Sequence, residues 1–537
     1  MQPAQGPLNS LKFFRHPGIL CGSVVASGNN STTATILREV RVLRILGSRR
    51  SLCGGHTRRD SLHIGGLSVL GLGLGDLLRA QESQNPSGSG TGFGKAKSCI
   101  LLLPYGSPPQ HETFDPKPDA PSEVRGEFQP ISTSVSGLQI CEGLPRIAKV
   151  ADRISIVRSM THPFPVHCTA YVTSGIPDYT PALETRPNDP ALWPYIGSVV
   201  DYVEERRSGI VPEVPRNVAI PWKMNSRGGE AASVQAGPYA AFLGSAYDPV
   251  LTNFGAEGTR EIIKQRPYGV DHKVKDPYAG IDSTARFEIA GVSEKKNVTL
   301  DRLDKRRDLL HQLSDAARVL ESQQTVRNYD RYRQMAWSLL SSPDVRRALD
   351  VQAEPGQIRD SYGMTLFGQS CLLARRLVEA GSRFVTVFWD EYAYLNTDWD
   401  THWNQTKRLR GWLWPGFDAA FSGLILDLEQ RGMLDDTLVV WMSEHGRTPR
   451  FNNEAGRDHW SRVYSIALAG GGVPRGQVIG ASDPLGGDVL ENPVSPKDIL
   501  ATIFHLLGID AHTIVHDGLG RPMPVAGTGT VRNELTL

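Results

Sequence analysis

The sequence predicts an α/β protein, a three-layer α/β/α sandwich around a mostly parallel central sheet. Residues 98–103 form an unbroken apolar run, which is typical of a strand buried on both faces. The last third of the chain alternates strand-like and helix-like segments, as repeated strand–helix–strand units do. Polar clusters follow several of these strands, and such sheets bind ligands beyond the carboxyl ends of their strands. We therefore expect the functional residues at that edge of the sheet.

The first two thirds of the chain give mixed signals. A helix is expected over residues 144–151, and strands over 154–157 and 217–220. Residues 225–297 are rich in loop-forming residues and give no clear assignment. The segment near 300–350 combines helical periodicity with many charges, so we expect exposed helices inserted into the fold.

The last third is more regular. Its expected helices span 366–380, 417–431 and 495–507, and its expected strands span 383–389, 437–441 and 463–469. Gly432 and Gly508 fit the ends of two helices, and Ser495-Pro496 fits the start of the last one. This alternation places the strands in one largely parallel sheet.

Composition excludes several classes of protein. The chain has 537 residues, of which 40% are hydrophobic and 21% charged, unlike a disordered, collagen-like or multi-span membrane protein. A formal net charge of +1 gives no indication of a nucleic-acid partner. Residues 1–60 hold nine Lys/Arg against two Asp/Glu, and the remainder holds 49 against 55. The basic excess therefore belongs to the N-terminal segment.

That segment resembles a twin-arginine export signal. Arg58-Arg59 precede a glycine-rich apolar run at 64–74, which is shorter than the roughly 20 residues that span a bilayer. Ser61 stands where such signals usually carry Phe, and 56 residues precede the motif, which suggests a start assigned too far upstream. A basic loop followed by a short buried helix is the alternative interpretation. We expect an exported protein of the periplasm or cell envelope, with no transmembrane span.

These features divide the chain into four parts. Residues 1–80 are an extension with the signal segment, 81–97 a polar linker, 98–525 a single domain, and 526–537 a C-terminal tail. The cysteines after the signal segment match no zinc-binding spacing. We expect buried thiols, although disulfides stay possible outside the cytoplasm. These cysteines are Cys99, Cys141, Cys168 and Cys371.

Two clusters after predicted strands carry metal-ligand chemistry. Asp400 and His402 lie two residues apart after the strand at 383–389, and Glu444-His445 follow the strand at 437–441. Carboxylate oxygen and imidazole nitrogen together suit zinc, manganese or a similar divalent ion. Arg447 fits a clamp on a tetrahedral oxyanion. The alternative is a charged turn in which Arg447 pairs with Glu444.

Two further clusters extend the pattern. His459 lies just before the strand at 463–469, beside Asp458, a candidate substrate-binding residue that alternatively forms a surface salt bridge with Arg457. His111 and Asp115 follow the first strand. The second strand is followed by hydroxyls and imidazoles that fit a nucleophile and its partner. Our candidates there are Thr161 and His167.

The four clusters together predict one metal centre. Five of the 14 histidines lie at or near predicted strand ends: His111, His167, His402, His445 and His459. Several oxygen and nitrogen ligands from separate strand tips are typical of a metal site on a parallel sheet. Two ions a few ångströms apart would stabilise a phosphoryl-type transition state.

These residues carry a resemblance to a known family. The tracts CILLLPYGSPPQHETFDPKPDAPSEVRGEF, WDTH, LDDTLVVWMSEHGRTPR, GRDHWSRVYSIALAGGGV and SPKDILATIFHLLGID resemble the family catalogued as domain of unknown function 1501. The resemblance covers about residues 57–525. That family is grouped with the alkaline phosphatase and sulfatase superfamily of two-metal hydrolases, which implies an alkaline phosphatase-like sandwich.

The resemblance also implies metal ligands. By the superfamily pattern they are Asp400, His402, Glu444, His445 and His459, with Asp115 matched more loosely. His111 is a further candidate ligand because of its place after the first strand. Relatives in the narrower family often carry Phe in place of His445.

The nucleophile departs from the pattern. Pro163 aligns with the nucleophilic Thr of nucleotide pyrophosphatases, and Thr161 is the nearest hydroxyl. The chain carries no Cys-x-Pro-x-Arg sulfatase motif.

The sequence therefore predicts an exported hydrolase of phosphate or sulfate esters, acting on a small-molecule or glycan ester with two divalent metal ions. The alternative is a non-catalytic envelope protein that keeps the fold and binds a glycan or a protein partner. The metal's identity and the oligomeric state stay open.

Overall fold

The computed structural model describes residues 91–229, 235–264, 271–289, 324–394 and 398–537. The chain divides into two compact units, Met1–Arg79 and Ala80–Leu537, and the described residues all belong to the second. The predicted signal segment lies outside the described residues, as does the part of the predicted helical insertion before residue 324.

A nine-stranded sheet organises the second unit, and the predicted α/β class is confirmed. Its strand order is β15-β4-β14-β11-β1-β10-β5-β6-β9, with β14 and β9 running opposite to the other strands. The bounds are β1 Ser98–Pro104, β4 Ile154–Met160, β5 Asn217–Ile220, β6 Val250–Phe254, β9 Phe287–Ile289, β10 Phe384–Trp389, β11 Thr437–Trp441, β14 Tyr464–Ala469 and β15 Gln477–Ile479.

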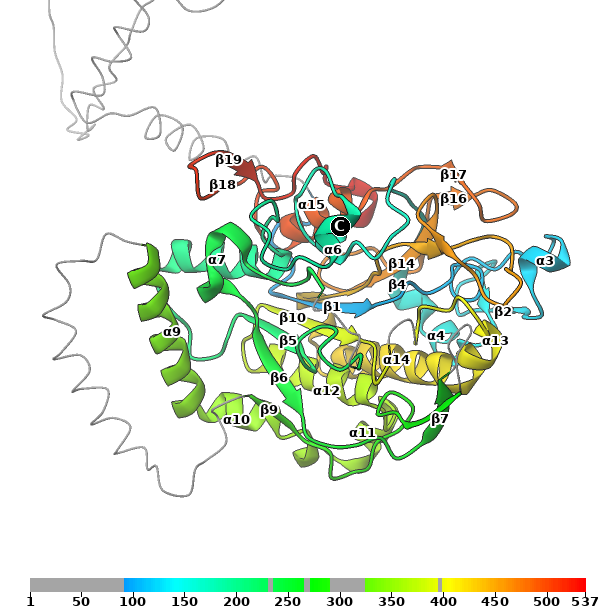
Figure 1. Cartoon of the computed structure of the whole chain (residues 1–537), viewed down its shortest axis with the longest axis horizontal. Helices are drawn as coiled ribbons and strands as arrows, with labels where there is room; N and C mark the ends of the chain where they lie inside the picture. Colours follow the sequence, from blue (N-terminus) through cyan, green and yellow to red (C-terminus); the bar gives the residue numbers. More distant parts are fainter. Residues whose placement is uncertain (1–90, 230–234, 265–270, 290–323, 395–397) are drawn as a thin grey trace, which may run out of the picture. The chain divides into compact units, whose positions relative to one another are not determined.

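Helices cover both faces of this sheet (Figure 1). Successive residues of β1 point to opposite faces: Ile100 packs in one hydrophobic core and Leu101 in another. The core around Ile100 contains α12 (Leu366–Glu379) and α14 (Trp414–Gln430). The core around Leu101 contains α7 (Ile196–Ser208) and α15 (Pro496–Leu506). Burial on both sides explains the unbroken apolar runs of the central strands.

Most predicted elements are present with shifted ends. The helix expected at 144–151 is only the four-residue α4 (Pro145–Ala148), and the strand expected at 154–157 continues to Met160. Gly432 and Gly508 follow their helices with φ of 67° and 76°, as left-handed helix ends require. Within the predicted insertion the structure describes α9 (Gln324–Ser341) and α10 (Pro343–Leu349).

Short elements fill the connections. The two-stranded ribbons pair β2 (Pro130–Ser132) with β3 (Gln139–Cys141), β7 (Glu261–Lys264) with β8 (His272–Lys275), β12 (Gly446–Arg447) with β13 (His459–Trp460), β16 (Ala481–Ser482) with β17 (Val489–Glu491), and β18 (Ile514–His516) with β19 (Pro522–Pro524). The short helices are α3 (Ser122–Arg125), α5 (Thr169–Val172), α6 (Pro181–Glu184), α11 (Gly356–Ser361) and α13 (Gln405–Arg408), which continues into the π-helical turn η6 (Leu409–Leu413).

Both ends of the described chain pack on this unit. Gly94 N–H donates to the carbonyl of His505 at 3.0 Å, so the end of the predicted linker lies against α15. Leu537 N–H donates to Gly472 at 2.9 Å, which anchors the predicted tail. Cys99, Cys141, Cys168 and Cys371 are buried free thiols. Within the described ranges, every helix is too short or too polar to cross a membrane.

A capping box begins α15, and its loss should destabilise the fold. One oxygen of Asp498 accepts from the Ser495 N–H and hydroxyl at 3.0 and 2.8 Å, and the other accepts from Thr530 N–H at 2.9 Å. Asp498→Asn should lower the free energy of unfolding by about 1–2 kcal/mol at pH 7, measured by urea denaturation. Asp435→Asn is the control, because that carboxylate is 87% exposed and pairs with Arg475 at the surface.

The same contacts predict a pH dependence. Although partial burial raises the pKa of Asp498, the hydrogen bonds from Thr530 and Ser495 hold it below the ordinary 3.8. Because the folded-state pKa of Asp498 is depressed, its carboxylate stabilises the fold at pH values above the unfolded-state pKa. That stabilisation is lost as the pH falls through the folded-state pKa. The difference between Asp498→Asn and the original protein should therefore shrink below about pH 4. An unchanged difference at pH 3 would contradict this assignment.

Candidate metal centre

The strand directions bring the predicted ligands to one edge of the sheet. The parallel strands β1, β10 and β11 all end there, at Pro104, Trp389 and Trp441. Because β14 is antiparallel to β11, its beginning lies at the same edge as their carboxyl ends. His459 therefore joins the cluster although it precedes β14, whereas Asp400 follows β10 and Glu444 follows β11.

Asp400, His402 and His459 form one compact group of candidate ligands. Oδ1 of Asp400 lies 3.2 Å from Nε2 of each histidine, and the two Nε2 atoms are 3.0 Å apart. Three ligand atoms at tetrahedral corners around zinc would be roughly 3.3 Å apart, given zinc–nitrogen distances of about 2.0–2.1 Å. The observed spacing therefore fits three ligands that share one ion.

His167, His445 and His459 form a second group, with ligand atoms within 4.8 Å of one another. Nδ1 of His445 lies 2.8 Å from the carbonyl of Gly446 and so carries the proton. That tautomer leaves Nε2 with a lone pair, and this buried atom has no hydrogen-bond partner. Oδ2 of Asp400 is also buried without a hydrogen bond, and Nε2 of His167 lies 3.6 Å from it. Two buried acceptors without hydrogen bonds, beside three imidazoles, fit a divalent cation.

Glu444 lies between the histidines and the loop after β1. Its Oε1 accepts from the Gly106 N–H at 3.1 Å and lies 3.2 Å from Nδ1 of His167. Its Oε2 accepts from the Ser443 hydroxyl at 2.5 Å and the Ser107 hydroxyl at 3.4 Å. The carboxylate is fully buried and is therefore fixed in orientation.

Burial and charge set the protonation states. Burial lowers the pKa of His445 well below its usual range and that of His459 to about 4, so both rings are neutral at neutral pH. Asp400 is also buried, but Arg447 and His167 hold its pKa well below the usual value. Burial alone would lower the pKa of His167, yet Asp400 and Glu444 raise it to about 10. His445 and His459 are thus neutral, whereas His167 is held in its protonated form between the carboxylates of Asp400 and Glu444.

The sequence family follows from a comparison with family models. The model described as "Protein of unknown function (DUF1501)" matches residues 96–536. The chain belongs to this family. The match confirms the family that the sequence resembles and covers every candidate site residue.

Comparison with solved structures shows distant similarities. The PsFucS1 sulfatase from Pseudoalteromonas is 13% identical over 80% of this chain and 70% of that chain, with a TM-score of 0.31. A phosphonate monoester hydrolase from Silicibacter pomeroyi is 12% identical over 77% and 73%, with a TM-score of 0.30. The alkaline phosphatase from the Antarctic bacterium TAB5 is 12% identical over 70% and 92%, with a TM-score of 0.30. Curated proteins gave no match.

In this DUF1501 chain Arg447 holds the site together. Its guanidinium is fully buried and donates to Oδ1 of Asp400 at 2.5 Å. Its three nitrogens also donate to the carbonyls of Gly106, Ser107, Trp399 and Arg457. The sequence predicts an oxyanion clamp at Arg447, but all three guanidinium nitrogens already contact protein oxygens. The geometry makes Arg447 a partner of Asp400, and among the described residues Arg447 and Glu444 form no ion pair.

Asp458 and His167 lie in places that suit other roles than those the sequence predicts. Asp458 Oδ1 lies 2.8 Å from Nδ1 of His402 and accepts from Asn452 at 3.0 Å, so the carboxylate orients an imidazole ligand. The alternative, a salt bridge between Asp458 and Arg457, is replaced by a buried pair between Arg457 and Glu112. His167, expected to assist a nucleophile, lies among the candidate metal ligands.

Six predicted residues lie outside both ligand groups, and three of them, Glu444, Arg447 and Asp458, contact a ligand of those groups. The other three are Asp115, His111 and Thr161. Asp115 forms an ion pair with Lys117 at 2.9 Å and accepts from the Ser482 hydroxyl. His111 Nε2 lies 2.8 Å from the carbonyl of Leu485. The loop after β1 turns these two side chains toward the β16–β17 region. Thr161 is half-buried, and its N–H donates to the carbonyl of Val494.

The structure adds residues that sequence reasoning missed. Gly106 has a φ of 100°, and a Cβ there would overlap the backbone of Asp400, so only glycine permits this approach. Ser107 follows with a φ of 68°, and its hydroxyl accepts from the His445 N–H at 3.2 Å. The Tyr-Gly-Ser sequence directly after β1 is the signal for this tight turn.

Removal of Arg447 should show how strongly the pair stabilises the protein. Arg447→Met leaves the buried Asp400 carboxylate uncompensated, which should lower the free energy of unfolding by about 3–5 kcal/mol. Arg450→Met is the control, because Arg450 is 70% exposed and lies 3.9 Å from Glu123; its cost should be below about 0.5 kcal/mol. Chemical denaturation of the two variants measures both. Equal costs would show that the buried pair stabilises nothing.

Proposed function

We propose that the protein is a divalent-metal-dependent hydrolase of phosphate or sulfate esters. The observation that carries the proposal is the buried Nε2 of His445, which has no hydrogen-bond partner, in a cluster of imidazoles beside Asp400 Oδ2, which has no hydrogen bond and lies 3.6 Å from Nε2 of His167. Leaving such atoms unpaired in a protein interior costs free energy unless a cation satisfies them. Resemblance to the two-metal hydrolase superfamily supports the same chemistry.

The residues that would hold two ions are the two groups described, which share His459. Asp400, His402 and His459 would supply one ion's ligands, and His167, His445 and His459 those of the other, with Glu444 Oε1 3.2 Å from Nδ1 of His167 as a further candidate ligand. A pair of divalent ions, when bound, stabilises the charge that develops on an ester undergoing displacement. Zinc, calcium, manganese and magnesium are the candidate ions, and the imidazole-rich donor set favours zinc or manganese.

The protein's own groups prepare this chemistry. Asp458 fixes the ring of His402, and Arg447 fixes the carboxylate of Asp400. The side chains of His402, His459 and His167 are 24, 20 and 12% exposed, whereas those of Asp400 and Glu444 are fully buried. An ester therefore approaches from the imidazole side. Thr161, in the loop that leads to His167, is our candidate nucleophile.

Export is part of the proposal. Arg58-Arg59 and the apolar run after them support transport of the folded protein through the twin-arginine pathway. Substituting both arginines by lysine should retain the protein in the cytoplasm. Cell fractionation with an antibody against the folded domain measures this, and an unchanged distribution would contradict the proposal.

Metal analysis of purified protein tests the site. We expect up to two divalent ions per chain, and about 10- to 100-fold weaker metal affinity in Asp458→Asn, because His402 loses its orienting carboxylate. His402→Ala and His445→Ala should each lose one ion. His512→Ala is the control, since that side chain is 84% exposed and contacts Asp510 at the surface. Full metal content in His402→Ala and His445→Ala would refute the assignment.

Ester hydrolysis separates an enzyme from a binding protein. The metal-loaded protein should cleave aryl phosphate or aryl sulfate esters, and chelation should abolish turnover. Thr161→Ala should remove that activity without changing the metal content if Thr161 is the nucleophile. Bound metal with no turnover on either ester class would favour the alternative, an envelope protein that keeps the fold and binds a glycan or protein.

A further inference from the structure

His162, in the loop after β4, is a buried histidine outside both groups of candidate ligands. The residue is 7% exposed, and its ring lies against those of Tyr171 and Tyr464, with centroids 5.5 and 5.7 Å away. The Phe164 N–H donates to Nδ1 at 3.2 Å, and Nε2 lies 2.6 Å from the backbone carbonyl oxygen of Glu444. Nδ1 is therefore the acceptor and Nε2 carries the proton. Both nitrogens are engaged, so this imidazole is not itself a metal ligand.

The hydrogen bond from His162 fixes the peptide group between two candidate ligands. The carbonyl of that peptide belongs to Glu444 and accepts from His162, while its N–H belongs to His445 and donates to the Ser107 hydroxyl at 3.2 Å. A peptide held at both its oxygen and its nitrogen is fixed in orientation. The Glu444 carboxylate and the His445 ring therefore keep their directions.

Among the described residues, only a weak second donor reaches the same carbonyl. This donor is the Cys168 thiol, whose Sγ lies 3.9 Å from the Glu444 oxygen. Because Glu444 is fully buried, loss of the imidazole would leave its carbonyl without a strong partner, which costs free energy. Part of that cost is recovered if the peptide turns toward another donor, and such a turn would displace both ligands.

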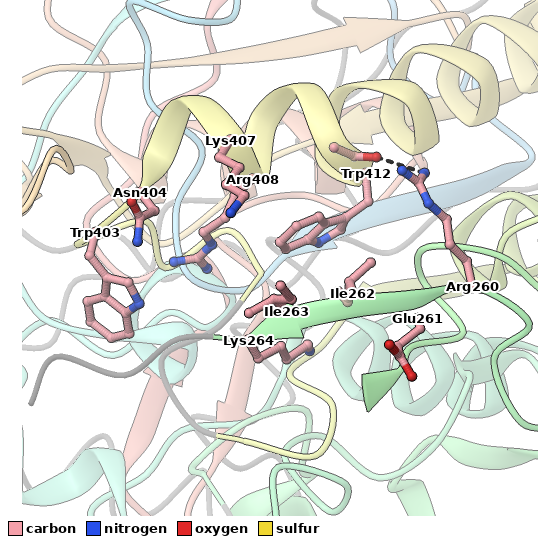
Figure 2. Close-up of a pocket in the computed structure, with 11 residues that line it drawn as sticks. Arg260, Glu261, Ile262, Ile263, Lys264, Trp403, Asn404, Lys407, Arg408 and Trp412 are labelled. Atoms are coloured by element: carbon pink, nitrogen blue, oxygen red, sulfur yellow. Dashed lines mark hydrogen bonds between the residues drawn. The ribbon is translucent and has the colours of Figure 1, made fainter. Parts of the chain in front are cut away.

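The first ligand group, which comprises Asp400, His402 and His459, has supports of its own. Arg447 pairs with the Asp400 carboxylate. Arg408, drawn in Figure 2, extends from α13 and donates from Nη1 to the backbone carbonyl of Asp400 at 2.8 Å. Neither contact involves the side chain of His162.

His162 contacts the segment that follows His459 through its main chain. Its N–H donates at 3.0 Å to the carbonyl of Ser461, two residues after His459. A side-chain substitution leaves this backbone bond in place. The imidazole therefore supports the second ligand group, which comprises His167, His445 and His459, by way of His445.

We propose that His162 is a positioning residue of the metal centre: its Nε2–H directs His445 and Glu444 toward the ion that the second ligand group would hold. The inference rests on the proposed function for the presence of that ion. It gives a role to an imidazole that the proposed ester chemistry leaves unused. It also makes the two ions separable, because one side-chain change weakens the second group and spares the first.

Two substitutions of equal length separate the hydrogen bond from the packing. In His162→Gln the amide Nε2 lies as many bonds from Cβ as the imidazole Nε2 does, so the donor is kept. His162→Met fills a similar volume without a donor. His505→Met is the matched control, because His505 is also 7% exposed and its Nε2 lies 3.0 Å from a backbone carbonyl, that of Thr91 beside α15.

Calorimetric titration of the chelator-treated full chain with Zn²⁺ measures the effect in two backgrounds. In His402→Ala, which keeps the second group whole, His162→Met should weaken Zn²⁺ binding about 10- to 100-fold. In His445→Ala, which keeps the first group whole, the same change should alter binding by less than about twofold. In both backgrounds His162→Gln should stay within about threefold of its parent, and His505→Met within about twofold.

Equal weakening by His162→Met in the two backgrounds would show that His162 merely stabilises the fold, and it would overturn the proposal. Equal losses in His162→Gln and His162→Met would overturn it too, since the donor would then be irrelevant. Urea denaturation checks that each variant folds. Should His162→Met fail to fold, His162→Asn takes its place, because its amide ends one bond short of the carbonyl and should weaken the second group in the same way.

The inference and the proposed function fail by different results. A protein that binds no Zn²⁺ before any substitution would refute the metal centre, and this inference with it. Two bound ions that keep their affinities in His162→Met would refute the positioning role and leave the metal centre intact.

Discussion

The buried pair of Arg447 and Asp400 is the contact on which the rest of the site depends. Neither charge is stable alone in the interior, so each fixes the position of the other. The same guanidinium binds the backbone of the loop after β1, through Gly106 and Ser107, and the backbone before Asp400, through Trp399. One side chain thereby ties the loops after three neighbouring strands into a single arrangement. The ligand spacing of about 3 Å between Asp400, His402 and His459 is a product of that constraint.

Burial then decides the charge of each group in the cluster. A neutral imidazole with a free lone pair is a metal ligand, and desolvation favours that state for His445 and His459. Carboxylates are kept ionised in the same environment only because cations or hydrogen-bond donors face them. Asp400 has Arg447 and His167, and Glu444 has His167, the Ser443 hydroxyl and the Gly106 N–H. The fold thus prepares anionic oxygen and neutral nitrogen together, which is the donor set that divalent ions of the zinc and manganese kind prefer.

Sequence reasoning predicted the sheet and the core of the cluster because both follow from local patterns. Apolar runs mark the strands, and Asp400, His402, Glu444 and His445 come soon after two of them. The roles of Arg447 and Asp458 were not predictable, since their partners are backbone atoms and a histidine contributed by distant segments. Asp115 and His111 show the opposite case, in which a local pattern groups residues that the fold places apart. They follow β1 as the pattern requires, but the intervening loop turns them toward Ser482 and Leu485, and no local signal records that turn.

The pairing of β12 with β13 has a consequence for how the site tolerates change. Arg447 lies directly opposite His459 across this two-residue ribbon, so the segment 448–458 is a closed loop whose base is fixed by backbone pairing. The rest of that loop packs on the segment that carries His402: Asn452 donates to the carbonyl of His402 at 2.8 Å, and Asn404 N–H donates to the carbonyl of Glu454 at 3.0 Å. An insertion or deletion in the loop would therefore displace His402 together with the loop. The two segments are thereby constrained to change together, so the length of this loop is tied to the geometry of the centre.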